Sequence, residues 1–280
     1  MHTPVLLQKV VENLDIKADL LYVDATAGEG GHLQELLQKA GRVLALDADI
    51  EQIKKLRAKY SEFVFKGSLI VEKANFADLL KVCKRNSFLP VNGVLIDLGL
   101  SYDQINQSTR GFSYKKLDEV LDMRVDKSKN LIAADVVNSF TADELYGIFS
   151  KFSEDLNSRA IAKGIVRSRN IKKINKVGDL TQVIEKSIGK KDMKTIARIF
   201  QALRIETNNE INNLKKVLSD SPEVLLKGGK LLIITFHSVE DRIVKNFINQ
   251  SKTFSQREII KGSDLVSFER SAKLRVLIKN

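Results

Sequence analysis

This 280-residue chain has five polar residues that could bind a ligand or take part in catalysis, and each follows a short apolar segment. They are Asp24, Asp47, Asn75, Asp97 and His237. The apolar segments are typical of buried parallel strands and lie at residues 20–23, 43–46, 69–71, 93–96 and 230–235. In an open α/β sheet, ligands bind at the carboxyl ends of the strands. One polar residue there would most often be a helix cap or part of a turn, but five together predict a ligand site.

The turn after the first segment is rich in glycine and reads Asp-Ala-Thr-Ala-Gly-Glu-Gly-Gly-His over residues 24–32. Glycines let the backbone approach a ligand closely and expose amide donors at the start of the next helix. A dinucleotide-binding fingerprint would need a third glycine where Leu33 stands. Asp47 can accept hydrogen bonds from both hydroxyls of a ribose, in a nicotinamide or an adenosine cofactor. Asp47 could instead cap the helix expected to begin at Ile50, although Asp49 could serve as that cap.

Helical patterns separate the first four strands, for example at residues 33–39 and 50–58, as βαβ units require. About 130 residues then precede the fifth strand, far more than an ordinary connection needs. Their pattern is helical. We therefore expect an α/β fold whose core, residues 1–103 and 201–280, carries an inserted helical subdomain at residues 104–200.

The return from this insertion to the sheet is expected to be one long amphipathic helix over residues 196–218. Gly228 and Gly229 should then end a helix and open the fifth strand. The alternation over residues 271–278 predicts a last, antiparallel strand.

Positive charge is concentrated inside the expected insertion. The chain carries a net charge of +11, and residues 156–200 hold 12 Lys and Arg against 3 Asp and Glu. Arg159, Lys163 and Arg167 recur every four residues, so they share one helix face. This face could be an ordinary solvated surface, or it could bind the phosphate backbone of a nucleic acid. Membrane association is the weaker alternative, because the chain has no tryptophan to accompany the charges.

Composition excludes several other classes of protein. A single cysteine, Cys83, cannot form an internal disulfide, which favours a reducing compartment. No apolar run approaches the roughly 20 residues that span a bilayer, and the first residues lack the features of a signal peptide. We therefore expect a soluble cytoplasmic protein. With three scattered histidines and one cysteine, a structural zinc site is not expected.

Several motifs, in order along nearly the whole chain, together form one highly specific pattern. They are His2–Leu7 (His-Thr-Pro-Val-Leu-Leu), Asp24–His32, Asp97–Ser101 with Gln104, Arg110–Ser113, Leu121–Arg124, Phe200–Ile205, Phe236–Lys245 and Ser271–Arg275. The sequence resembles the bacterial 16S rRNA cytosine-N4 methyltransferase family, called RsmH or MraW. The resemblance implies an S-adenosylmethionine-dependent enzyme with a Rossmann-like class I methyltransferase core and an inserted helical subdomain. It also implies N4-methylation of a decoding-centre cytidine, number 1402 in standard rRNA numbering, of the small ribosomal subunit.

The resemblance also implies which residues contact the cofactor: Gly30, Gly31, His32, Asp47, Phe76, Asp97 and Gln104. Gly30 and Gly31 would clear space for its methionine part, and Asp47 would hold the ribose. Phe76 would lie against the adenine or be an ordinary core aromatic. Asp97 would face the cationic amino or sulfonium group, with Gln104 at the same end.

Three departures from the family pattern lie outside these cofactor residues. Tyr102 stands where the family usually has a second serine, and Ser153-Glu154-Asp155 replaces a Gly-Glu-Glu. Residues 267–270, Ser-Phe-Glu-Arg, replace a longer Asn-Pro-Arg-containing stretch. These changes bear on local loop shape.

The implied reaction needs help because the lone pair of the cytosine amine is delocalised into the ring. An enzyme has to align this amine with the methyl–sulfur bond and accept hydrogen bonds from it. DNA amino-methyltransferases use an Asp/Asn-Pro-Pro-aromatic turn, but here the position reads Asp97-Leu98-Gly99-Leu100. Candidates for handling the amine or its proton are His237, Asp122 and Arg124. His237 could equally be structural, and Asp122 with Arg124 is more simply read as an ion pair, so no catalytic base is assigned.

Two functions of other classes stay open at this stage. One is a nicotinamide-dependent oxidoreductase, which the missing third glycine disfavours. The other is a non-enzymatic RNA-binding protein on a methyltransferase-like fold, which the full set of polar strand ends disfavours. Measured affinity for the cofactor would separate the second from an enzyme.

Overall fold

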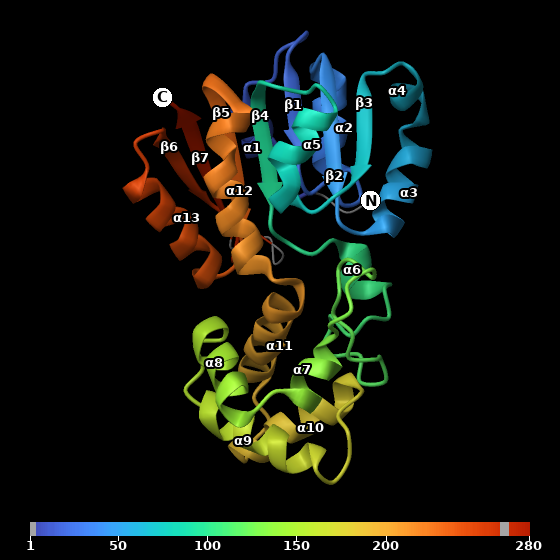
Figure 1. Ribbon diagram of the computed structural model, residues 1–280, viewed down its shortest axis with the longest axis vertical. Coiled ribbons are helices and arrows are strands. Elements are labelled where there is room, and N and C mark those ends of the chain that lie inside the picture. The colour runs from blue at the N-terminus through green and yellow to red at the C-terminus, as the bar shows by residue number, and fades with distance from the viewer. Residues whose placement is uncertain (1–3, 264–268) are drawn as a thin grey trace. The chain divides into compact units, whose positions relative to one another are not determined.

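The computed structural model describes residues 4–263 and 269–280, which form two compact units (Figure 1). Unit 1 comprises Met1–Leu100 and Ile211–Asn280, and unit 2 comprises Ser101–Glu210. The insertion expected at residues 104–200 lies inside unit 2, which begins three residues earlier, at Ser101, and ends ten residues later, at Glu210. His2 and Thr3 of the first family motif, and Ser267 and Phe268 of the shortened segment, lie outside the described residues.

Unit 1 is built on a seven-stranded sheet with the order β3-β2-β1-β4-β5-β7-β6 (Figure 1). The strands are β1 (Leu21–Asp24), β2 (Arg42–Asp47), β3 (Leu69–Lys73), β4 (Val91–Asp97), β5 (Leu225–Thr235), β6 (Phe254–Lys261) and β7 (Lys273–Lys279). The first five strands are parallel, whereas β7 runs antiparallel to both β5 and β6. Chain order reverses between β1 and β4, which is where an open α/β sheet forms its ligand crevice. The predicted Rossmann-like α/β core is confirmed.

Helices cover both faces of this sheet, because its parallel strands are apolar on both sides. They are α1 (Leu7–Leu14), α2 (Gly31–Lys39), α3 (Ile50–Lys59), α4 (Ser61–Phe65), the 3₁₀ turn η1 (Phe76–Asp78), α5 (Leu79–Arg85), α12 (Glu210–Val224) and α13 (Ser238–Gln250). One core cluster joins α1, α2 and α3 to side chains such as Tyr22, Ala45 and Leu232. The second joins α5, α12 and α13 to the opposite face, including Val94 and Ile233. The alternation of these side chains along each strand fixes the register.

Two expectations about the second half of the core are wrong, and one strand was not predicted. The helix over residues 196–218 is two helices, because Asn209 adopts a left-handed conformation with φ +55° and ends α11 (Met193–Asn208). Gly228 and Gly229 lie within β5, where they form an irregularity in its pairing with β4; α12 has already ended at Val224. Strand β6 was not predicted, because six of its eight residues are exposed and no apolar alternation marks it.

Unit 2 is helical and consists of α6 (Tyr102–Asn106), α7 (Ala133–Ser139), α8 (Ala142–Phe152), α9 (Ser158–Arg169), α10 (Val177–Ile188) and α11. Helices α9 and α10 approach closely at Gly164, where an added Cβ would meet Oγ of Ser187 at 1.9 Å. Only a glycine permits this crossing. Among the helices that the structure describes, none is long and apolar enough to span a membrane.

Candidate active site

The glycine turn joins β1 to α2 at the carboxyl edge of the sheet. Gly30 has φ +80° and precedes the first turn of α2, and its carbonyl accepts a 2.8 Å hydrogen bond from the Tyr60 hydroxyl. A Cβ on Gly30 would lie 2.7 Å from the Tyr60 ring, and one on Gly31 would lie 2.3 Å from Cγ of Pro4. The space these glycines leave open is therefore taken by the protein's own side chains. The role predicted for them, clearing room for a ligand, is not what their Cβ positions show.

Asp47 ties this turn to the end of β2. Its carboxylate accepts hydrogen bonds from the backbone N–H of Gly28 at 2.8 Å and of Asp49 at 2.7 Å. The cap of α3 is Asp49, whose side chain accepts from the N–H of Glu51. Of the two sequence alternatives for Asp47, the capping role therefore belongs to Asp49. Because a carboxylate offers about four acceptor positions, Asp47 keeps capacity for ribose hydroxyls.

Two further carboxyls lie at the ends of the adjacent strands β1 and β4: Asp24 is 1% exposed, and the side chain of Asp97 is 21% exposed. Burial raises the pKa of each carboxyl to about 7. The negative charge of Asp97 also raises the pKa of Asp24, and the negative charge of Glu240 also raises the pKa of Asp97. Oδ1 of Asp24 accepts a hydrogen bond from the N–H of Thr26, whereas its buried Oδ2 has no hydrogen-bond partner among the described residues. Asp24 was noticed as a strand end but not assigned to the cofactor, and its orphaned oxygen is visible only in three dimensions.

His32, on the first turn of α2, faces Asp97. Its Nε2 lies 3.8 Å from Oδ2 of Asp97, and its side chain is 8% exposed. Burial lowers the pKa of His32 to about 4, and neither ring nitrogen has a hydrogen-bond partner in the described part of the chain. The pair therefore consists of a neutral imidazole and a carboxyl that is easily protonated.

The donor set at these strand ends fits a positively charged ligand with hydroxyl groups. Three carboxyls from β1, β2 and β4, two of them buried, repel one another, so a cation placed among them would stabilise their charged forms. The buried Oδ2 of Asp24 is left for such a ligand. An S-adenosylmethionine, which carries a sulfonium, an ammonium and a ribose diol, matches this chemistry. Asp24 and Asp97 would meet its positive groups, and Asp47 its ribose.

Phe76 and Gln104 have local partners of their own. Phe76 is half-buried at the start of η1 and packs against the core cluster that contains α5. The strand-end residue before it, Asn75, is a cap, accepting from the N–H of Ala77. In unit 2, Gln104 is 4% exposed and forms a reciprocal capping box with Ser101 at the start of α6.

His237 follows β5 and caps α13, with a partner that the sequence interpretation missed. Its Nε2 lies 3.1 Å from Oε1 of the buried Glu240, although the alignment is not that of a hydrogen bond. The other carboxylate oxygen of Glu240 accepts from the N–H of Phe236 at 2.8 Å. The His-x-x-Glu spacing, which resembles a capping box, could have identified Glu240.

The remaining catalytic candidates form an internal ion pair in unit 2. Arg124 donates from Nε and Nη2 to the two oxygens of Asp122, each at 2.8 Å, and from Nη1 to the carbonyls of Lys127 and Lys129. Burial acts to raise the pKa of Asp122, but the hydrogen bonds and charge of Arg124 outweigh it and hold the pKa below its usual value. The guanidinium is thereby committed to its own loop, which favours the bracing role.

The predicted basic face of unit 2 lies on α9. Arg159, Lys163 and Arg167 are exposed, while Ile161 and Ile165 are buried on the other side of the helix. The Arg159 guanidinium lies 4.1 Å from the centre of the Tyr146 ring. Within the described residues, Lys163 and Arg167 have no acidic partner within 4 Å.

Comparison with known proteins identifies close relatives over the whole chain. The sequence pattern of the MraW methylase family matches residues 1–280. Ribosomal RNA small subunit methyltransferase H of Dictyoglomus thermophilum is 37% identical over 99% of this chain and 96% of its own length. The protein of that name from Clostridioides difficile is 40% identical over 88% of this chain and 80% of its own. The protein of that name from Cytophaga hutchinsonii is 38% identical over 92% of this chain and 85% of its own length.

Proposed function

This chain belongs to the MraW methylase family, and from that premise we propose that it methylates N4 of a cytidine in the decoding centre of 16S rRNA. The cytidine is number 1402 in standard rRNA numbering, the methyl donor is S-adenosylmethionine, and the substrate is the small ribosomal subunit in the cytoplasm. The observation that carries the proposal is the cluster of three carboxyls at the ends of three adjacent strands, the buried Asp24 and Asp47 and the partly buried Asp97.

The cofactor supplies an electrophilic methyl group on a positively charged sulfur. Asp97 and Asp24 hold the cationic end in a site from which water is largely excluded, where electrostatic attraction is stronger than at the surface. Asp47 orients the ribose while its own position is fixed by the N–H groups of Gly28 and Asp49. His32 stays neutral and adds no positive charge beside Asp97.

The amine that is methylated has to lose a proton. His237 stands at the end of β5, next in the sheet to β4 with Asp97, and Glu240 lies 3.1 Å from its Nε2. In this arrangement Nδ1 of His237 would accept the proton by giving up its 3.4 Å cap contact with the N–H of Glu240, and the Glu240 carboxylate at Nε2 would stabilise the resulting imidazolium. The substrate RNA is held by Arg159, Lys163 and Arg167 of unit 2, which serve as the phosphate-binding face.

The oxidoreductase alternative is less compatible with the packing around α2. Leu33, which takes the place of the third glycine of a dinucleotide fingerprint, is fully buried in the core beneath the turn. Close approach of helix and strand at that glycine is part of the dinucleotide-binding geometry. A buried leucine side chain occupies that position here.

The test is to incubate unmethylated small ribosomal subunits with the enzyme and S-adenosylmethionine labelled in its methyl group, and then to map the modified nucleotide. We expect label at N4 of one decoding-centre cytidine. The Asp97→Asn variant should lose most of this label, whereas Asp78→Asn, which alters an exposed carboxylate of the same unit, should retain it. Label on another base, or on no RNA at all with a cofactor-binding enzyme, would contradict the proposal.

A further inference from the structure

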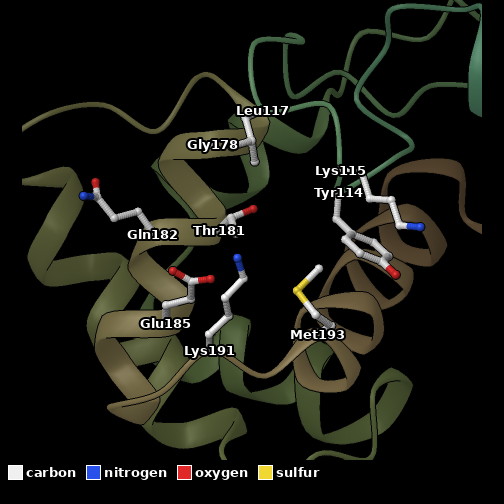
Figure 2. A pocket seen from close by; sticks show the side chains of 9 residues that line it. All are labelled: Tyr114, Lys115, Leu117, Gly178, Thr181, Gln182, Glu185, Lys191 and Met193. Atoms are coloured by element: carbon white, nitrogen blue, oxygen red, sulfur yellow. The ribbon is translucent and has the colours of Figure 1, made fainter.

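Unit 2 contains a cavity of about 490 Å³ that belongs neither to the carboxyl cluster nor to the basic face of α9 (Figure 2). It opens between α10, the start of α11 and the loop that carries Tyr114 and Leu117. Its volume is within the range of about 300–1,000 Å³ typical of small-molecule sites. It can therefore accept one nucleotide-sized group.

The walls of this cavity are fixed to one another by the backbone. The N–H of Gly178, on α10, donates a 2.8 Å hydrogen bond to the carbonyl of Leu117, and the N–H of Val177 donates to Glu119 at 3.0 Å. The Tyr114 ring packs edge-to-face on the buried Phe200 with 6.1 Å between ring centres. A ligand would therefore bind with little ordering of the protein.

The cavity combines apolar and charged side chains on opposite sides. Tyr114 and Met193 face Thr181, Glu185 and Lys191 across the opening in Figure 2. Leu117 and Met193 are 52% and 40% exposed, unusually open for side chains of their size. Such exposed apolar and aromatic groups suit the faces of a planar ring, and the Glu185 carboxylate and Lys191 ammonium suit its polar edge.

Glu185 is unusual within this basic part of the chain. Residues 156–200 contain three acids. Of these, Asp179 binds Lys172 and Asp192 caps α11, whereas Glu185 has no hydrogen-bond or ion-pair partner in the residues that the structure describes. Lys191, on the same cavity, is likewise unpaired within residues 4–263 and 269–280. A free carboxylate would repel RNA phosphates, so its contribution to an RNA surface would come from accepting a hydrogen bond from a base.

We propose that this cavity binds one unstacked nucleobase of the RNA substrate that carries an exocyclic amine. The amine donates to Glu185, the neighbouring ring nitrogen or carbonyl accepts from Lys191, and Tyr114 and Met193 contact the ring. The exposed Lys115, which lines the opening, contacts an adjoining phosphate. The proposal rests on the RNA substrate of the proposed function and adds a base-reading site to it.

The experiment measures binding of short single-stranded oligocytidylate and oligouridylate of equal length to the full chain by fluorescence anisotropy. Cytosine and uracil have the same ring size, so the comparison isolates the pairing edge, where cytosine presents an amine and an acceptor N3 and uracil presents a carbonyl and an N3–H. We expect the wild type to prefer oligocytidylate by about fivefold or more, as one good base-edge pair provides. Glu185→Gln should bring this ratio close to one, because a carboxamide suits the uracil carbonyl as well as the cytosine amine.

The controls separate base reading from overall charge. Asp143→Asn removes one exposed negative charge of α8 and should leave the cytidylate-to-uridylate ratio unchanged. Lys191→Gln should weaken binding more than Lys186→Gln, which alters an exposed lysine of α10 outside the cavity. An equal ratio in wild type and Glu185→Gln overturns the proposal. Methylation of subunits is measured separately. A base preference without methylation would contradict only the proposed function, whereas methylation without a base preference would contradict only this inference.

Discussion

The two units present charge in opposite ways. In unit 1, loss of hydration raises the pKa values of Asp24, which is buried, and Asp97, which is partly buried, to about 7. In unit 2, Lys163 and Arg167 are exposed to solvent. A buried charge destabilises the free protein and attracts an opposite charge strongly, because little water screens it. An exposed charge costs little and attracts at longer range, but salt weakens it. The first arrangement suits one small cation, and the second a long polyanion.

The difference also concerns what each charged group needs from its neighbours. Asp47 is held by two backbone donors, and the Asp24 carboxyl by the N–H of Thr26. The basic residues of α9 need only a rigid helix, whose apolar side is fixed by Ile161 and Ile165. Substitutions in unit 1 should therefore change stability and binding together, whereas those on α9 should change RNA binding alone.

The largest effect is expected for Asp24→Asn in the absence of cofactor. A carboxyl whose folded pKa is raised contributes stability that is fully present below its ordinary pKa and is lost as pH rises through about 7. Asparagine stays neutral and can still accept from Thr26. At about pH 8 the variant should be more stable than the wild type by up to about 4 kcal/mol, and at about pH 4 equally stable. Urea unfolding at the two pH values measures this difference.

The same variant should bind S-adenosylmethionine more weakly, so its stability and affinity change in opposite directions. Calorimetric titration measures the affinity, and Asp78→Asn serves as the exposed control. A variant that loses stability at both pH values while keeping wild-type affinity would show that Asp24 is only structural. The proposal that the carboxyls of unit 1 bind a cation would then lose its most deeply buried residue.

A smaller effect is expected for Asp47→Ala, which should weaken S-adenosylmethionine binding by about 1–3 kcal/mol through loss of a charged hydrogen-bond partner. Because Asp47 also accepts from Gly28 and Asp49, alanine leaves two N–H groups unpaired. Asp47→Asn keeps one acceptor and should preserve more of the turn. Calorimetry of both variants, with circular dichroism to verify folding, would remove Asp47 from the site if neither lost affinity.

Cofactor affinity should itself depend on pH. If a cation binds the charged forms of Asp24 and Asp97, binding releases protons below about pH 7. Affinity should then rise with pH, by up to about tenfold per pH unit for each proton released, and level off above about pH 7. S-adenosylhomocysteine, which lacks the positive sulfur, should show a shallower rise. Equal slopes for the two ligands would place the sulfonium away from these carboxyls.

The sequence predicted the parallel core because its signals are local. Each predicted strand is a short apolar run followed by a polar residue, and the observed strands β1 to β5 contain these five runs except for Leu20. Strand β6 lacked such a signal, since a solvent-exposed edge strand needs no apolar side chains. The break at Asn209 was also hidden, because the apolar positions of α11 and α12 continue the same helical period across it.

Site residues were predictable by type but not by role. The spacing of strand ends placed Asp24, Asp47 and Asp97 together, yet only their burial distinguishes the orphaned Asp24 from a turn residue. Asn75 shows the opposite outcome, since its side chain is an ordinary cap. Glu240 and Glu185 were missed because their significance depends on contacts that spacing alone does not determine. Glu240 pairs with His237, whereas Glu185 has no partner in the described residues.

The smallest effect on any single ligand is expected on α9, where the triple variant Arg159→Gln, Lys163→Gln, Arg167→Gln should weaken RNA binding and leave cofactor binding unchanged. Each lost phosphate contact should reduce the log–log salt slope of RNA affinity by about 0.7–0.9. Arg159 also stacks on Tyr146, so its contribution to the salt slope should be smaller than that of Lys163.

The matched control removes three exposed lysines of unit 1, Lys54, Lys66 and Lys84, which already pair with acids. Salt titrations of rRNA-fragment binding measure the slopes. Equal slopes for both triple variants would mean that α9 is merely a solvated helix face, and that RNA recognition depends on another part of the chain.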